Sequence, residues 1–369
     1  MNLEYSDEQM MLRDQVTKFC ESDYTFDKRE KIISSDEGFN KDIWKQFSDL
    51  GWLSIPFNED NGGFNFGPIE LSIIFEEFGK NLVVEPYLAN VVMSGKLLEI
   101  INSDQSKSLI TKIISGDKQI SLAISEPDNA YNFHSIKTNV SESNSKILLN
   151  GNKSIVLNSK NADYFIVYAV NQDKENGLYL VNSDTAGLSI NNFKTFDGQI
   201  CGELTFENVE VDKSNVLVSG DSSVDAINSV MDYINLCLSA EAVGAMIASY
   251  TKTVQYTKER EQFDQPISNF QVLQHKMVDM FIEAEISKSL LFKAMLQLDS
   301  NDNDASKTIS SLKAQIGKSG RFVGQTAVQL HGGMGVSDEM SIGHYLKRLT
   351  AIDALFGNRN YHLNRFASL

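Results

Sequence analysis

Hydrophobic side chains recur at helical spacing along the first part of the chain. Ser6 and Gln9 have the spacing of a capping box. The apolar positions that follow them are Met10, Met11, Leu12, Val16 and Phe19. Residues 43–53 repeat this period, and residues 68–79 begin with proline and end with glycine, which is the usual asymmetry of a helix. The pattern therefore predicts an N-terminal helical region.

The pattern changes near residue 118, where short runs rich in β-branched and aromatic residues begin. These runs occupy residues 120–124, 146–149, 164–168, 178–181 and 203–206. The pairs Asn150-Gly151, Asn176-Gly177 and Asp197-Gly198 are typical of turns between strands. This middle segment is predicted to form a mainly antiparallel β-domain.

Helical spacing returns near Val224 and continues to the end of the chain. The polar stretch 301–304 separates two long predicted helices. The sequence thus predicts an α+β protein with three domains: a helical domain over 1–117, a β-domain over 118–220 and a helical bundle over 221–369.

Composition narrows the class of protein. The 369 residues include 33 Lys and Arg against 49 Asp and Glu, and the resulting formal charge of −16 argues against a general nucleic-acid binder. Cys20, Cys201 and Cys237 form neither a disulfide framework nor a zinc motif, so we expect a reducing, cytoplasmic location and no metal site. The start of the chain does not read as a secretory leader, and no uninterrupted apolar run predicts a membrane span.

Several separated motifs follow one another along nearly the whole chain. They are Leu50-Gly51-Trp52 with Asn61-Gly62-Gly63, Leu122 to Pro127, Asn150 to Lys153, Phe206 to Val211, Arg260 to Ile267 with Phe270-Gln271, and Gln329 to Val336. In this order and combination they resemble the acyl-CoA dehydrogenases. The resemblance implies an N-terminal helical domain, a middle β-barrel-like domain and a C-terminal four-helix bundle that makes most oligomer contacts.

The resemblance also implies a cofactor and a reaction. Members of the family bind FAD between subunits and oxidise acyl-CoA thioesters, usually passing electrons to an electron-transfer flavoprotein. By resemblance, Arg260 would pair with the FAD pyrophosphate, since a guanidinium suits phosphate. The other implied cofactor contacts are Ser125, Phe263, Gln271, Gln329, Gly332 and Gly333, the last three approaching the FAD of a neighbouring subunit.

The sequence departs from the family where the catalytic base is expected. Aligned without gaps, the family's C-terminal Glu falls on Gly357, and the Glu that other members place before Arg260 falls on Ile234. Neither residue can accept a proton, although the Gly357 backbone N–H can still donate to a thioester oxygen. The flavin-facing Trp and Thr of the family fall on Ile155 and Leu157.

Glu241 is the candidate for a substitute base. It is the only charged residue between Asp232 and Lys252 and shares an apolar stripe with Ile234, so we expect it to be buried with a raised pKa. It lies about two turns, or roughly 10 Å, from Ile234, which counts against direct replacement. The alternative is a structural Glu held by a neighbouring Arg, Lys or backbone group.

Three hypotheses about function follow. The run from Leu355 to Leu363 resembles acyl-CoA dehydrogenases built from two different homologous subunits, so the first is a subunit that shares FAD sites with a Glu-bearing partner in a heterotetramer. The second is a self-sufficient homo-oligomer that uses Glu241 or another carboxylate. The third is a non-catalytic assembly subunit.

Overall fold

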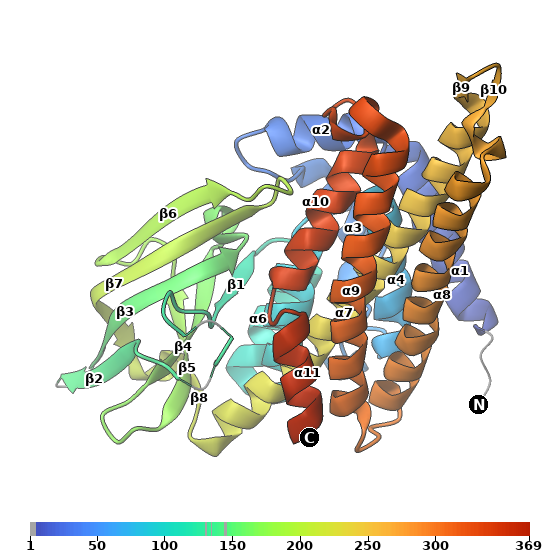
Figure 1. Ribbon diagram of the computed structural model, residues 1–369. Coiled ribbons are helices and arrows are strands. Elements are labelled where there is room, and N and C mark those ends of the chain that lie inside the picture. The colour runs from blue at the N-terminus through green and yellow to red at the C-terminus, as the bar shows by residue number, and fades with distance from the viewer. Residues whose placement is uncertain (1–4, 130, 134, 144–145) are drawn as a thin grey trace. The chain divides into compact units, whose positions relative to one another are not determined.

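The computed structural model describes residues 5–129, 131–133, 135–143 and 146–369 (Figure 1). Contacts within the chain divide it into two units. One unit takes Met1–Lys31, Gly67–Val83 and Asn235–Leu369, and the other takes Ile32–Phe66 and Val84–Ile234. The first is helical, and the second combines short helices with the sheet.

Long helices build the first unit. They are α1 (Asp7–Asp23), α4 (Pro68–Asn81), the second part of α7 (Asp221–Glu259), α8 (Gln271–Asp299), α9 (Ala305–His331), α10 (Ser341–Ala354) and α11 (Arg359–Ser368), while α2 (Phe26–Ser34) begins here. The predicted capping box is confirmed, because Ser6 Oγ accepts from Gln9 N at 3.2 Å and Gln9 Oε1 accepts from Ser6 N at 2.9 Å. Val16 and Phe19 are buried as predicted, but Met10 and Met11 face solvent.

The glycine that was predicted to end the 68–79 helix has another role. Helix α4 continues to Asn81 and ends at Leu82, which adopts φ 54°. A Cβ on Gly79 would lie 1.9 Å from the carbonyl oxygen of Glu241, and a Cβ on Gly244 would lie 1.9 Å from that of Glu76. The two glycines therefore let α4 and α7 approach each other backbone to backbone.

Helix α7 is long and apolar enough to cross a membrane by length and composition alone, with an 18-residue window of mean hydropathy 1.3. A search for uninterrupted apolar runs does not detect this window, because polar residues are scattered through it. Since 89% of the window is buried inside the protein, the helix has the character of a core helix.

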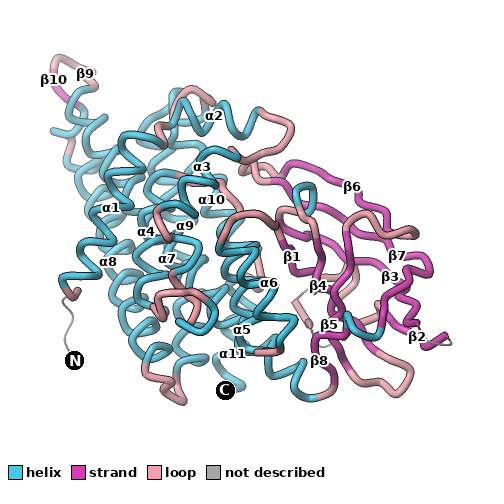
Figure 2. The backbone as a smooth tube through the Cα atoms, turned by 180° about the vertical axis from the view of Figure 1, so that it is seen from behind, coloured by secondary structure: helices cyan, strands magenta, loops and turns pink. Residues whose placement is uncertain are grey.

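The second unit contains the strands β1 to β8, drawn in magenta in Figure 2. Their bounds are β1 Ile120–Ala123, β2 Asn139–Ser143, β3 Lys146–Leu157, β4 Tyr164–Val170, β5 Asn176–Asn182, β6 Leu188–Lys194, β7 Ile200–Asp212 and β8 Val216–Ser219. The strand order is β6-β7-β3-β2-β4-β5-β8, with β1 parallel to β4. The remaining pairs are antiparallel apart from a single β2–β4 pairing, which confirms the prediction of a mainly antiparallel domain.

Short helices complete this unit: α3 Lys41–Asp49, the π-helix Leu88–Lys96, α5 Leu97–Ile101 and α6 Asp104–Ile114. The side chains of Leu149, Phe165 and Leu204 lie in the sheet's hydrophobic core. Of the predicted turns, Asp197-Gly198 is confirmed between β6 and β7. The other two predictions are wrong: Asn150-Gly151 lies at a bulge within β3, and Asn176-Gly177 begins β5.

Candidate active site

Six of the predicted cofactor residues gather at one end of the helical unit. Arg260, Phe263 and Gln271 lie in or beside the small hairpin of β9 (Glu261–Gln262) and β10 (Gln265–Pro266), which projects beyond the ends of α7 and α8 (Figure 1). The other three, Gln329, Gly332 and Gly333, lie where α9 ends. The two groups are joined by a ring stack between Tyr256 and His331, whose centroids are 4.2 Å apart.

The hairpin presents its side chains outward. Its two turn residues, Phe263 and Asp264, have φ values of 55° and 58°, a conformation that Asn and Gly adopt more readily. A non-glycine residue held there costs on the order of 1 kcal/mol, and Phe263 is 86% exposed. Within the described part of the chain, no hydrogen bond or ion pair engages the Arg260 guanidinium. The hairpin thus offers a free cation and an exposed ring.

The end of α9 offers open backbone. A Cβ built on Gly332 or Gly333 would meet nothing within 4 Å, and Gly332 has φ 61°. The missing side chains leave room for another group to approach the main chain closely. A free guanidinium, an exposed aromatic ring and accessible glycines fit a large anionic cofactor that binds from outside this chain's own core. FAD is such a group.

Ser125 belongs to the other unit, two residues after β1. Its carbonyl oxygen accepts a hydrogen bond from Ser154 N at 2.9 Å. Ile155 follows at a bulge in β3, partly exposed and with φ 51°. A β-branched residue at positive φ is strained and needs its surroundings to hold it. The position that faces the flavin in the family is thus occupied here by Ile155, in a strained backbone conformation.

A buried ion pair supports this bulge. Lys153 Nζ lies 2.8 Å from Glu126 Oε1, and Glu126 also accepts from the backbone N–H groups of Lys137 and Thr138. Burial raises the pKa of Glu126, but the Lys153 charge and these hydrogen bonds outweigh it and hold the pKa below its usual value. Burial lowers the pKa of Lys153 to about 8, so both groups are charged at neutral pH.

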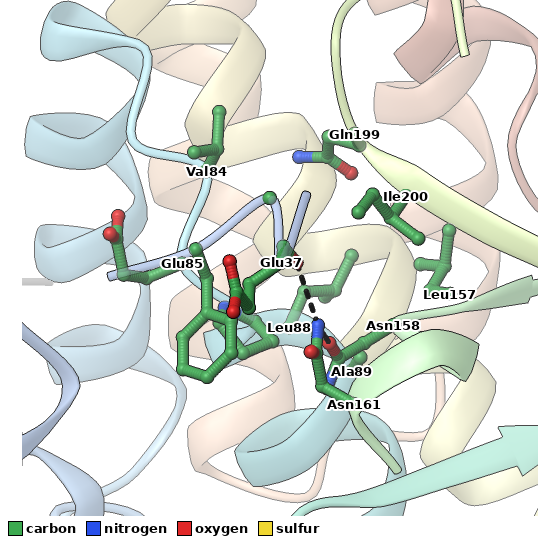
Figure 3. A pocket seen from close by; sticks show the side chains of 13 residues that line it. Glu37, Val84, Glu85, Leu88, Ala89, Leu157, Asn158, Asn161, Gln199 and Ile200 are labelled. Carbon is green, nitrogen blue, oxygen red and sulfur yellow. Dashed lines mark hydrogen bonds between the residues drawn. The ribbon is translucent and has the colours of Figure 1, made fainter. Parts of the chain in front are cut away.

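A small cavity lies within the same unit (Figure 3). Leu157, Asn158, Asn161 and Ile200 line one side of it, and Asn161 donates to the carbonyl oxygen of Glu37 at 2.9 Å. Its volume of about 40 Å³ has room for a few water molecules, not for a flavin ring or an acyl chain. The cavity is therefore not a candidate substrate site.

The position of the family's C-terminal base is closed to any side chain. Gly357 is buried with φ 115°. A Cβ there would lie 2.4 Å from Tyr361 Cδ1 and 2.6 Å from His362 Nε2. Its backbone N–H donates to no acceptor among the described residues. The other position of a base, Ile234, is fully buried and apolar.

Glu241 is buried in an ion pair with Arg348 of α10. Arg348 Nε lies 2.5 Å from Glu241 Oε1, and Nη2 lies 2.7 Å from Oε2. The carboxylate is thus held on both oxygens, as the structural alternative predicts. To act as a base, Glu241 would first have to release Arg348. No local pattern in the sequence indicated this partner, which lies 107 residues further along the chain.

No group of three or more His, Cys, Asp or Glu side chains suited to a metal ion occurs within the described ranges. All three cysteine thiols are buried, and none of them forms a disulfide bond. Burial, and then the Glu241 charge, raise the pKa of the Cys237 thiol, which disfavours the reactive thiolate.

Comparison with known proteins gives one consistent family. The N-terminal, middle and C-terminal domain models of the acyl-CoA dehydrogenases match residues 6–117, 121–209 and 224–368. A probable acyl-CoA dehydrogenase of Bacillus subtilis, YngJ, is 28% identical over 94% of this chain and 93% of its own length. Mitochondrial isovaleryl-CoA dehydrogenase of Pongo abelii is 28% identical over 93% of this chain and 84% of its own length. Among solved structures, a chain of the ChsE4–ChsE5 complex of Mycobacterium tuberculosis superposes with a TM-score of 0.90 and is 22% identical. The match covers 100% of this chain and 98% of that chain.

The fold and these matches define a flavin-dependent oxidoreductase that acts on CH–CH bonds. The chain belongs to the acyl-CoA dehydrogenase family. The predicted architecture of N-terminal helical, middle β and C-terminal helical domains is confirmed, while the three residue boundaries remain predictions.

Proposed function

We propose that this chain is one subunit of a heteromeric acyl-CoA dehydrogenase, in which a homologous subunit supplies the catalytic carboxylate. The observation that carries the proposal is the closed position at Gly357, where Tyr361 and His362 occupy the space that a side chain would need. Ile234 is buried and apolar, so neither position where the family places its catalytic Glu carries a base. The candidate for a substitute base, Glu241, is held in an ion pair with Arg348.

The chain's own residues supply cofactor and substrate contacts. Arg260 would pair with the FAD pyrophosphate, Phe263 would pack near the adenine and Gln271 would hydrogen-bond the cofactor. Gln329, Gly332 and Gly333 approach the ADP part of a neighbouring subunit's FAD, and Ser125 offers its hydroxyl to the flavin. The chemistry that bound FAD would supply is that of an acceptor for the hydride from the substrate Cβ.

The Gly357 N–H donates to the thioester oxygen and stabilises the charge that develops when the Cα proton leaves. That proton passes to the carboxylate of the homologous subunit, which must lie within hydrogen-bond reach of it. Binding of the carbonyl and removal of the proton are thus divided between two chains.

Two relatives support a shared assembly. The ChsE4–ChsE5 structure is a complex of two named chains, and its fold matches this chain over its whole length. A relative from Acetobacterium woodii, 25% identical over 92% of this chain, is a subunit of a caffeyl-CoA reductase–Etf complex. We propose an electron-transfer flavoprotein as the electron acceptor, and a reducing, cytoplasmic location, which three cysteine thiols outside any disulfide bond support.

Co-expression tests the assembly. The chain is produced alone and together with each homologous, Glu-bearing protein of its organism, and the purified species are weighed by native mass spectrometry. The proposal expects a complex that contains both chains and FAD. A homo-oligomer that carries a full complement of FAD would contradict it, and a mixed complex without flavin would favour a non-catalytic assembly subunit.

A further inference from the structure

A fully buried lysine lies beneath the Gly357 segment. Lys313 belongs to α9 and is 0% exposed. Its ammonium donates to three backbone carbonyl oxygens: that of Ile352 at 2.8 Å, that of Leu355 at 2.9 Å and that of Gly357 at 3.0 Å. An ammonium has three protons, so all of its donors are used on main-chain acceptors.

These acceptors belong to one continuous stretch of backbone. Ile352 lies in the last turn of α10, where carbonyl groups lack partners inside the helix. Leu355 and Gly357 flank Phe356, and the consecutive residues Phe356 and Gly357 have φ values of 53° and 115°. Phenylalanine is disfavoured at positive φ, so this turn needs interactions that hold it. The three hydrogen bonds of Lys313 provide them.

The same turn carries an unpaired backbone donor. Gly357 is a buried residue whose N–H has no acceptor in the part of the chain that the structure describes, whereas its carbonyl oxygen accepts a hydrogen bond from Lys313 Nζ. Buried N–H groups without a partner are rare in folded proteins, because leaving one unpaired costs free energy. A backbone N–H without an acceptor, next to a carbonyl group held by hydrogen bonds, is the arrangement expected of a site where a ligand supplies the acceptor.

The lysine is costly to keep in this place. Burial lowers its pKa to about 7, since the ammonium loses its hydration, and the nearby Asp353 charge offsets only part of this effect. No carboxylate within the described residues forms an ion pair with Lys313. Its three hydrogen bonds all go to the backbone of the end of α10 and of the following turn, so its effect is to fix the path of the main chain there.

We infer that Lys313 is a positioning residue: it fixes the Leu355–Gly357 turn so that the Gly357 N–H is held in place to bind a thioester carbonyl oxygen. The inference rests on the proposed function, because it takes Gly357 as a contact of the acyl-CoA thioester. Lys313 itself touches neither substrate nor cofactor.

Two variants of Lys313 separate its donors from its bulk. Lys313→Met keeps most of the side-chain volume but leaves three carbonyl groups unpaired. Lys313→Ala leaves a cavity that propylammonium, which replaces the missing atoms and the charge, can fill. Leu312→Ala is the matched control, because it removes a fully buried side chain from the same helix and lowers stability without removing a donor.

The readout is the carbonyl stretch of the bound thioester. Isotope-edited infrared spectra are recorded with [1-¹³C]butyryl-CoA and [1-¹³C]octanoyl-CoA on the full chain, in whichever form carries FAD, alone or with its homologous subunit. A hydrogen bond to the carbonyl oxygen lowers the stretching frequency, and a change in packing elsewhere does not. Affinity for the same ligands is measured in parallel.

We expect the wild-type protein and Leu312→Ala to lower the stretching frequency of the bound thioester carbonyl. Lys313→Met should lose most of this shift and bind about tenfold more weakly. Propylammonium, but not propanol, should restore the shift of the carbonyl stretch in Lys313→Ala. If this variant does not fold alone, it is refolded in the presence of the amine, and the same result is expected. A full shift in folded Lys313→Met overturns the inference alone, while the absence of a shift in the wild-type protein overturns the proposed role of Gly357 and the inference with it.

Discussion

At the scale of single residues, buried charges mark where the chain is fixed from inside. Glu241 with Arg348, Glu126 with Lys153, and Lys313 with three carbonyl groups are all shielded from water. In each case close hydrogen bonds offset part of the cost of burial, and removing one partner leaves the other buried without that compensation. The first two arrangements lead to separate predictions.

The Glu241–Arg348 pair is expected to stabilise the fold without taking part in proton transfer. Glu241→Met alone should lower the free energy of unfolding by about 3–5 kcal/mol, because the buried Arg348 would lose the carboxylate that balances its charge. Glu241→Met combined with Arg348→Met should recover most of that loss. Urea unfolding measures both, and the double variant in complex with the homologous subunit should still bleach its flavin. A folded double variant that assembles but does not bleach would establish Glu241 as the base.

The Glu126–Lys153 pair predicts a dependence of stability on pH. The pKa of Glu126 lies below its usual value of 4.5 in the folded chain, so the unfolded chain binds more protons in that range. The contribution of Glu126 is thus present above about pH 4.5 and is lost as the pH falls through the lower, folded-state pKa. Unfolding curves between pH 7 and pH 3 should show this loss in the wild-type protein. Glu126→Gln should be less stable at pH 7 and should lack this component, so identical pH profiles would refute the assignment.

At the scale of elements, the close crossing of α4 and α7 depends on two glycines. Gly79→Ala should lower the free energy of unfolding by about 3 kcal/mol, because its methyl group would meet the Glu241 carbonyl and neither backbone can yield easily. Gly320→Ala is the control in α9, where the nearest atom to a new Cβ is a flexible Leu349 side-chain carbon at 3.3 Å. Its effect should stay within about 1 kcal/mol, since alanine also favours the helix. Equal effects of the two substitutions would rule out the proposed crossing constraint.

The helices and strands also show which patterns in the sequence were sufficient to predict secondary structure. Continuous apolar runs located β1, β4 and β5, because strands buried on both faces need them. Strand β6 was missed, since Ser189, Asn191 and Asn192 face solvent on a half-exposed strand. Gly79 was misread as a helix end because a glycine for close packing and a glycine for termination look alike in one sequence. The close-packing role of Gly79 depends on Glu241, which lies far away along the chain.

At the scale of the whole molecule, the order of motifs predicted the family and the candidate cofactor residues, and the structure brings six of those residues to one end of the helical unit. The sequence did not predict the partners Arg348 and Lys313. Their roles arise from contacts between α7, α9 and α10 that no local pattern encodes. The sequence showed that the position of the family's C-terminal Glu is occupied by Gly357. Only the structure shows that Tyr361 and His362 fill the space that a side chain at this position would need.

The central claim is that this chain needs a homologous, Glu-bearing subunit for catalysis. The most direct test is the visible spectrum of its flavin during anaerobic addition of short-chain and longer acyl-CoA, recorded for the chain alone and for the co-expressed pair. Bleaching of the oxidised flavin in the pair, and none in the chain alone, is the predicted result. Bleaching of a flavin bound to the chain alone would contradict the claim and would show that this chain carries its own base.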